Sequence, residues 1–263
     1  MNDLNFELQG FSLKFKSPQQ QDAMLIAHKV LQHDRILSKR RIYPIHEAWC
    51  TALADGVSQS PQAQLASKKI LQLVDQNQSM QVPFNFALLQ QQFCQYFSQL
   101  PEHHGTSTTL ITLTHSQSQF IEIQHLGNSR AYLYSLAQAT PQWRQLTRDH
   151  SFIEELLAPT DIQNRVSYAS CYDMLTQYFC ADDSHEVCLS PLQEQFLTEN
   201  EALVICTDGI YQSLACSHWP LLQPNLSLAN WLLQLKEKLE QHKPYDNASI
   251  VIVRLTSSKV HPQ

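Results

Sequence analysis

The sequence contains very little glycine. Only five glycines occur among 263 residues, whereas average usage of about 7% would give roughly 18. They stand at positions 10, 56, 105, 127 and 209. A chain so poor in glycine is expected to keep it where backbone geometry or close packing leaves no alternative. The five positions therefore indicate sharp turns or tight contacts between segments.

Paired cysteine motifs are also missing. The seven cysteines form no C-x-x-C pair, which argues against a structural zinc or a dithiol redox motif. Cys50 and Cys206 lie inside apolar, strand-like runs. We therefore expect reduced, buried thiols in a reducing compartment.

Long apolar runs and strong positive charge are absent too. No apolar run approaches the ~20 residues that a membrane span needs, and the first residues lack the basic start and apolar middle of a signal peptide. The net charge is −6 and the longest basic run is Lys39–Arg41, which argues against a nucleic-acid groove. These features predict a cytoplasmic protein with neither a nucleic-acid nor a membrane partner.

The pattern of apolar residues predicts an α+β fold with strands and helices in groups. Near-alternating residues predict a first strand from Phe6 to Phe15 with a bulge or turn at Gly10, and a four-stranded antiparallel meander begins near Thr108. Ser60 and Pro61 predict the N-cap and first turn of a helix. Further strands are expected at 24–31, 49–54, 202–207 and 248–255, and further helices at 85–100, 152–157 and 228–241. No linker is visible, so we expect one domain over residues 1–263.

Two apolar runs end in Asp-Gly, in TALADG (51–56) and LVICTDGI (203–210). Asp-Gly is a common turn dipeptide, and this is the simplest interpretation of either run alone. An unpaired carboxylate at the end of a buried strand is costly, however. Asp55 and Asp208 therefore stand out as two carboxylates that need a partner.

Further short motifs accompany these two along the chain. The series is SPQQQDAMLI (17–26), ALADGVSQSPQAQLAS (52–67), GTSTTL (105–110), LGNSRAYLY (126–134), LTRDHS (146–151), VICTDGIYQSL (204–214) and YDNASIVIV (245–253). In type and order it resembles the metal-dependent Ser/Thr protein phosphatases of type 2C (PPM), in particular their bacterial members. No single motif is specific, but seven in order are.

The resemblance implies an α-β-β-α sandwich of two antiparallel sheets flanked by helices, with two divalent metals in a cleft at one sheet edge. Asp55 would bridge the metals, the Gly56 carbonyl would bind one, and Asp208 and Asp246 would bind the other. Asp22 would lie at the second metal, often through water. These four aspartates would be the catalytic residues. An all-oxygen ligand set suits Mg²⁺ or Mn²⁺.

The implied activity is hydrolysis of phosphoserine or phosphothreonine by a metal-bridged water. Phosphoproteins would be the substrates, a Ser/Thr kinase would act in opposition, and we expect a monomer. Asp149 matches a position that helps hold a weaker third metal, although a turn or helix N-cap is an equally good interpretation. Residues 153–190 fall where the family carries a substrate-selecting flap, and a merely variable loop is the alternative.

The chain departs from the family at several positions. Ser17 stands where a phosphate-binding arginine is expected, and a serine cannot supply the bidentate guanidinium. Asn128 replaces an aspartate, with an expected effect on local hydrogen bonding, and Val57 leaves the general acid unassigned. A pseudophosphatase of the same fold, acting as a binding or regulatory module, is therefore one alternative. A metallohydrolase of small phosphoesters is another.

Overall fold

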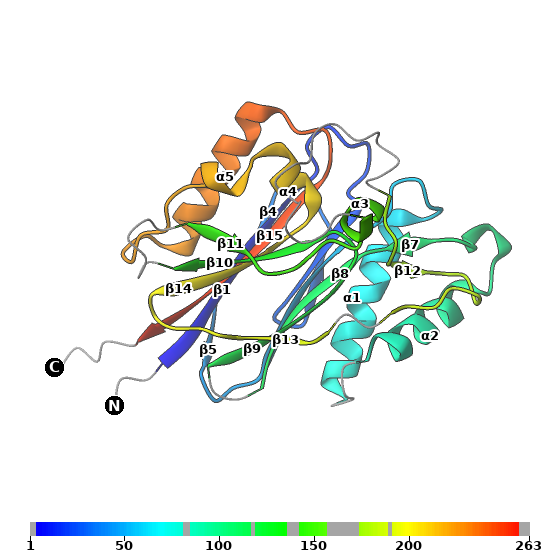
Figure 1. Ribbon diagram of the computed structural model, residues 1–263, viewed down its shortest axis with the longest axis horizontal. Coiled ribbons are helices and arrows are strands. Elements are labelled where there is room, and N and C mark those ends of the chain that lie inside the picture. Colours follow the sequence, from blue (N-terminus) through cyan, green and yellow to red (C-terminus); the bar gives the residue numbers. More distant parts are fainter. Residues whose placement is uncertain are drawn as a thin grey trace.

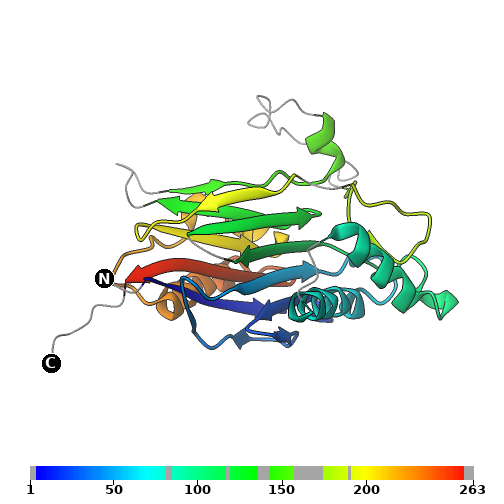
Figure 2. The same ribbon diagram turned by 90° about the horizontal axis from the view of Figure 1, so that it is seen from below.

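The computed structural model describes residues 4–80, 85–116, 119–135, 142–156, 174–188 and 191–257. Two antiparallel sheets pack face to face, with helices on the two outer sides (Figure 1). The layers are also visible in the second view (Figure 2), where the first and last strands run side by side. The α-β-β-α sandwich expected from the motifs is confirmed. None of the described helices is long and apolar enough to span a bilayer.

The first sheet has seven strands and joins the two ends of the described chain. Its strand order is β11-β10-β14-β15-β1-β4. Strand β4 pairs with the C-terminal part of β1, and β5 pairs with its N-terminal part. Strands β1 and β15 pair along their whole length, from Leu4 opposite Ser257 to Leu13 opposite Ala248. The strands are β1 (Leu4–Leu13), β4 (Ile36–Leu37), β5 (Arg41–Pro44), β10 (Arg130–Ser135), β11 (Trp143–Gln145), β14 (Glu201–Cys206) and β15 (Ala248–Ser257).

The second sheet has six strands in the order β13-β9-β8-β6-β2-β3, and β7 and β12 form a separate pair. Asp22 lies directly opposite Asp55 in the antiparallel β2–β6 ladder. The strands are β2 (Asp22–Ile26), β3 (Lys29–Leu31), β6 (Trp49–Asp55), β7 (Ser107–Thr108), β8 (Leu110–His115), β9 (Phe120–Leu126), β12 (Phe179–Cys180) and β13 (Gln193–Phe196).

Three hydrophobic clusters hold the four layers together. Trp231 of α5 packs on the outer face of the first sheet, Phe6 lies between the sheets, and Phe93 of α2 packs on the outer face of the second sheet. The helices expected at 85–100 and 228–241 thus contribute aromatic core residues. The helices are α1 (Ala63–Ser79), α2 (Phe86–Phe97), α3 (Phe152–Leu156), α4 (Asp208–Ser213) and α5 (Leu228–His242), with 3-10 turns η1 (Pro101–His103) and η4 (Cys216–His218).

Two of the predicted strands are wrong in detail. The expected strand 24–31 is a hairpin, because Ala27 and His28 adopt positive φ values of 51° and 60° between β2 and β3. Gly10 makes no bulge, since β1 continues through it. A Cβ at this position would collide with the Ile250 backbone, so close packing is the reason for glycine.

The predicted meander and the predicted helix cap are also wrong. Strands β8 and β9 belong to one sheet and β10 and β11 to the other, so the chain changes sheets between Leu126 and Arg130. Helix α1 begins at Ala63, and Gln62 precedes it without a side-chain cap. The hydroxyl of Ser60 instead donates to the carbonyl of Val57 and accepts from the amide of Ser107.

The cysteine prediction holds only in part. The six described cysteines form no disulfide with one another. Cys94, Cys180 and Cys206 are buried, but Cys188 is exposed, so the expectation of uniform burial is wrong. The seventh, at position 171, lies outside the described residues.

Candidate metal centre

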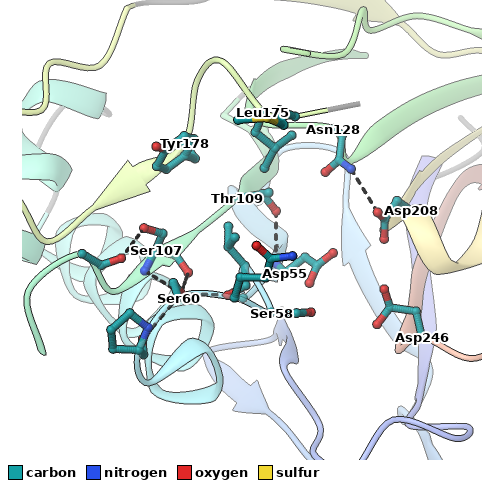
Figure 3. Close-up of a pocket in the computed structure, with 16 residues that line it drawn as sticks. Asp55, Ser58, Ser60, Ser107, Thr109, Asn128, Leu175, Tyr178, Asp208 and Asp246 are labelled. Carbon is teal, nitrogen blue, oxygen red and sulfur yellow. Dashed lines mark hydrogen bonds between the residues drawn. The ribbon is translucent and has the colours of Figure 1, made fainter. Parts of the chain in front are cut away.

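Four aspartates meet at one edge of the sandwich because antiparallel strands bring their ends together. Asp22 begins β2 and Asp55 ends β6, and the two are direct partners. Asp208 begins α4 just after β14, and Asp246 lies two residues before β15, which pairs with β14. Asp55, Asp208 and Asp246 line one cavity and point into it (Figure 3). The structure thus brings together residues that are up to 224 positions apart in the sequence (246 − 22).

Two glycines let the backbone approach this edge closely. A Cβ on Gly56 would collide with the carbonyl oxygen of Ala63 at the start of α1, and a Cβ on Gly209 would collide with the carbonyl oxygen of Asn247. Any larger residue would displace the segment that carries Asp55, Asp208 or Asp246. The turn interpretation of the Asp-Gly pairs is wrong, because Asp55 ends β6 and Gly56 bridges to Thr108, whereas Asp208 and Gly209 begin α4; both glycines are packing features.

Asp22 is the most deeply buried of the four. It is fully buried, and its Oδ2 accepts a hydrogen bond from the Thr207 hydroxyl at 2.8 Å, whereas its Oδ1 has no partner. Burial raises the pKa of Asp22 to about 7, although hydrogen bonds from Ser249 and Thr207 oppose the shift. This carboxyl group has one oxygen oriented by the protein and one oxygen left for another ligand.

The ionisation of Asp55 and of Asp208 is shifted by burial and by neighbouring charges. Burial raises the pKa of Asp55 well above its usual range, with further contributions from the charges of the other three aspartates. Burial and the charge of Asp246 raise the pKa of Asp208 to about 6. Oδ2 of Asp208 accepts from the Asn128 and Gln212 amides, both at 3.0 Å, while Oδ1 has no partner.

The four residues fit a hard divalent cation. Asp22 and Asp208 each bury a carboxylate oxygen without a hydrogen-bond donor, and such oxygens are costly unless something pairs them. Carboxylate oxygens are the ligands that Mg²⁺ and Mn²⁺ prefer. Within the described ranges, however, no three His, Cys, Asp or Glu side chains are already arranged as a metal site. The aspartates are gathered and partly oriented, and a cation would have to draw them together.

The cavity over the aspartates has a volume of about 600 Å³. Ser58, Ser60 and Ser107 contribute hydroxyl groups to one side, and Leu175 and Tyr178 lie on the opposite side (Figure 3). All the charged residues among its described lining are aspartates. An anionic ligand would thus find no cationic side chain among these residues.

Asp149 lies in different surroundings. Arg130 donates to both of its oxygens, from Nε at 2.8 Å and from Nη2 at 2.6 Å, in a pair that is largely buried. Asp149 lines a second cavity, with His125 and His150, and does not line the first. To bind a cation, its carboxylate would have to leave the ion pair with Arg130. The prediction of a third-metal ligand gains no support from this geometry.

The segment that carries Ser17 is tied to the Asp246 segment. The Asn247 amide donates to the carbonyls of Lys14 and Gln19, each at 3.1 Å. The Lys16 ammonium lies 4.3 Å from the centre of the exposed Tyr245 ring. The Arg40 guanidinium is engaged elsewhere, because its Nε lies 2.7 Å from a carboxylate oxygen of Glu7.

Some residues at the site were not identified from the sequence. Thr207 orients Asp22 by donating a hydrogen bond to it. Asn247 holds the residue before Asp22, because its Oδ1 accepts a hydrogen bond from the Gln21 backbone amide at 2.6 Å. Thr207 and Asn247 stand next to the predicted ligands Asp208 and Asp246. This adjacency is the only feature of the sequence that indicates a role for them at the site. Asn128 was noted as a departure affecting hydrogen bonds, and its partner proves to be Asp208.

No protein-family model and no curated protein matches the chain. Solved structures do. The serine/threonine phosphatase of S. agalactiae has a TM-score of 0.71 at 17% identity, over 95% of this chain and 99% of that one. Serine/threonine phosphatase Stp1 from Staphylococcus aureus has a TM-score of 0.69 at 17% identity, over 94% of each chain.

A third structure is the catalytic domain of the serine threonine protein phosphatase PstP in complex with two manganese ions. Its TM-score is 0.68 at 16% identity, over 96% of this chain and 99% of that one. These similarities establish that the chain has the fold of bacterial Ser/Thr phosphatases, as the ordered motifs predicted.

Proposed function

We propose that this protein is a Mg²⁺- or Mn²⁺-dependent phosphatase acting on phosphoserine and phosphothreonine in proteins. The observation that carries the proposal is the convergence of Asp22, Asp55, Asp208 and Asp246 at one edge of the sandwich, where Asp22 and Asp208 each bury a carboxylate oxygen that lacks a donor. The shared fold with bacterial Ser/Thr phosphatases, one of them a manganese complex, is consistent with it.

The proposed ligands are Asp22, Asp55, Gly56, Asp208 and Asp246. Two bound divalent cations would acidify a water molecule and polarise the phosphoryl group. The chain's own contribution is orientation: Thr207 holds one oxygen of Asp22, and Asn128 holds one oxygen of Asp208, so that the remaining oxygens are presented to the cations. Ser58 and Ser60 line the cavity, but their hydroxyl groups already donate to the Gln21 side chain and to the Val57 carbonyl, so binding of a phosphoryl oxygen would depend mainly on the cations.

The experiment is release of phosphate from a phosphothreonine peptide. We expect turnover in Mn²⁺ or Mg²⁺ and none in excess EDTA, with recovery when the metal is restored. Full activity in chelator would refute the metal mechanism. Asp55→Asn should be inactive, and the matched change Asp183→Asn, at an exposed position outside the cavity, should be fully active.

A pseudophosphatase is the second candidate, and the lack of a cationic side chain in the described lining favours it. Such a protein would bind Mn²⁺ without turnover. Calorimetric Mn²⁺ binding, together with no phosphate release under any metal, would support this candidate and exclude the first.

A further inference from the structure

The cavity over the aspartates has an apolar side whose purpose the chemistry does not explain. Met174, Leu175 and Tyr178 line it together. Leu175 and Tyr178 lie across from the Ser58 and Ser60 side chains (Figure 3). Met174 keeps 65% of its surface exposed. A bulky apolar residue at the mouth of a charged site exposes apolar area to water and gives nothing to metal binding.

The backbone holds this apolar side in place. The Phe152 amide donates to the Met174 carbonyl at 3.0 Å, and the Thr176 amide donates to the His150 carbonyl at 3.0 Å. Leu175 forms a bridge with Ser151 between these two bonds. The three residues 174–176 are thus paired with 150–152, so the apolar surface exists before any ligand arrives.

Tyr178 is fixed separately. Its ring stacks on the His185 ring, with centroids 4.9 Å apart and an interplanar angle of 25°. Its carbonyl also lies 2.8 Å from Nε2 of His185. The tyrosine therefore presents a positioned aromatic surface to the cavity, which lowers the entropic cost of binding an apolar group against it.

Size and charge indicate what this surface contacts. The cavity of about 600 Å³ is much larger than a phosphoryl group needs. Successive residues of an extended peptide advance by about 3.3 Å, so a neighbour of the phosphorylated residue would reach the cavity wall. An acidic neighbour would lose hydration there without gaining a partner, because the charged residues of the described lining are all aspartates.

We infer that Met174, Leu175 and Tyr178 form a subsite for a bulky apolar side chain next to the phosphorylated residue of a peptide substrate. The inference rests on the proposed function, since it names the substrate class of the same site. Apolar neighbours are selected and acidic neighbours are rejected.

The test uses phosphothreonine peptides that differ only in the two residues flanking phosphothreonine, which are leucine, alanine or glutamate. We expect kcat/KM of the leucine peptide to exceed that of the alanine peptide by roughly tenfold, with the glutamate peptide lowest. Equal values for the leucine and alanine peptides would overturn the inference.

A double variant, Met174→Ser with Tyr178→Ala, tests the residues. The leucine-to-alanine ratio of kcat/KM should fall to near one in this variant. The matched control is Met80→Ser, because Met80 has the same 65% exposure, at the end of α1 and outside the cavity; its ratio should equal that of the parent. An unchanged ratio in the double variant would overturn the assignment.

Binding separates this inference from the proposed function. Fluorescence anisotropy with non-hydrolysable phosphonate versions of the three peptides should give the same order of affinity, and the double variant should lose it. If neither the peptides nor p-nitrophenyl phosphate is hydrolysed, the proposed function fails while the binding order still decides the subsite. Identical affinities of the three phosphonates would overturn the subsite.

Discussion

At the scale of single residues, the crowding of Asp208 with the other aspartates should affect stability in opposite ways in the metal-free and the metal-bound protein. Asp208→Asn and Asp246→Asn should each reduce kcat by roughly 100-fold, because a charge that holds the cations is lost. In the metal-free state each variant should match or exceed the parent's melting temperature, since like charges in an empty site repel one another. Mn²⁺ should stabilise the parent more than either variant.

The advantage of Asp208→Asn should depend on pH. The pKa of Asp208 in the fold is raised to about 6, above the ~3.9 of an unfolded aspartate. The folded state therefore favours the protonated form, and this contribution to stability is lost as the pH rises through 6. In EDTA, the melting temperature of Asp208→Asn should exceed that of the parent at pH 7.5 and should differ little from it near pH 4. A parent more stable than both variants at pH 7.5 would argue against clustered carboxylates.

Ser17 stands where the motif resemblance leads us to expect a phosphate-binding arginine, and its substitution tests how phosphate binds. Ser17→Arg should lower KM for a phosphopeptide by up to about tenfold, if one charge-assisted contact contributes ~1.5 kcal/mol, because the described lining offers no cation. Ser17→Ala should change little, since the Ser17 hydroxyl donates to the carbonyl of Gln19 within its own loop. Steady-state kinetics on both variants measures this.

The competing explanation is that Lys16, held over Tyr245, already supplies the positive charge. Lys16→Ala would then raise KM strongly, and Ser17→Arg would not lower it. Lys236→Ala on α5 removes the same charge from an ion pair 3.7 Å long with Glu240, which makes it a suitable control. A large rise in KM for Lys16→Ala, without one for Lys236→Ala, would contradict the prediction made for Ser17→Arg.

At the scale of elements, one buried hydrogen bond joins the two sheets at the site. The Thr207 hydroxyl, just after β14, donates to Asp22 at the start of β2. Thr207→Val keeps the shape but removes the donor, and should lower the free energy of unfolding by about 2 kcal/mol because a buried carboxyl loses a partner. Thr207→Ser keeps the hydroxyl and should retain most of the stability. Urea denaturation in EDTA compares the three proteins.

A smaller loss for Thr207→Val than for Thr207→Ser would mean that methyl packing, and not this bond, matters at position 207. Metal affinity gives a second readout. If Thr207 orients Asp22, Thr207→Val should weaken Mn²⁺ binding about tenfold or more, whereas Thr207→Ser should leave it close to the parent value.

At the scale of the whole molecule, metal binding should stabilise the entire sandwich, because the ligands come from both sheets. At a free Mn²⁺ concentration 100 times the dissociation constant, the stabilisation should be ~2.7 kcal/mol, which corresponds to a rise in melting temperature of roughly 5–10 °C. Calorimetry over a range of Mn²⁺ concentrations measures it, with Asp55→Asn as the control. A melting temperature independent of Mn²⁺ would contradict the assignment.

The sequence by itself determined the types of elements, and the resemblance of its ordered motifs indicated the layers and the candidate ligands. Periodic apolar residues predicted α2, α5 and the long strands, because amphipathic patterns are local and repeat within each element. Asp55 and Asp208 were identifiable because each stands at the abrupt end of an apolar run, whereas Asp22 and Asp246 were indicated only by the resemblance of the ordered motifs. The scarcity of glycine marked Gly56 and Gly209, and at both positions a Cβ would collide with a backbone carbonyl.

Only the tertiary structure decided which segments meet. Nothing local distinguishes β9 from β10, yet they belong to different sheets, since the choice depends on partners far away in the chain. Asn128 donates a hydrogen bond to Asp208, which is 80 residues away in the sequence, and Arg130 donates to Asp149, which is 19 residues away. Neither pairing is visible in the local sequence. Short strands such as β12 and β13 carry too few residues for a periodic signal, and they form because a neighbouring edge offers unpaired backbone groups.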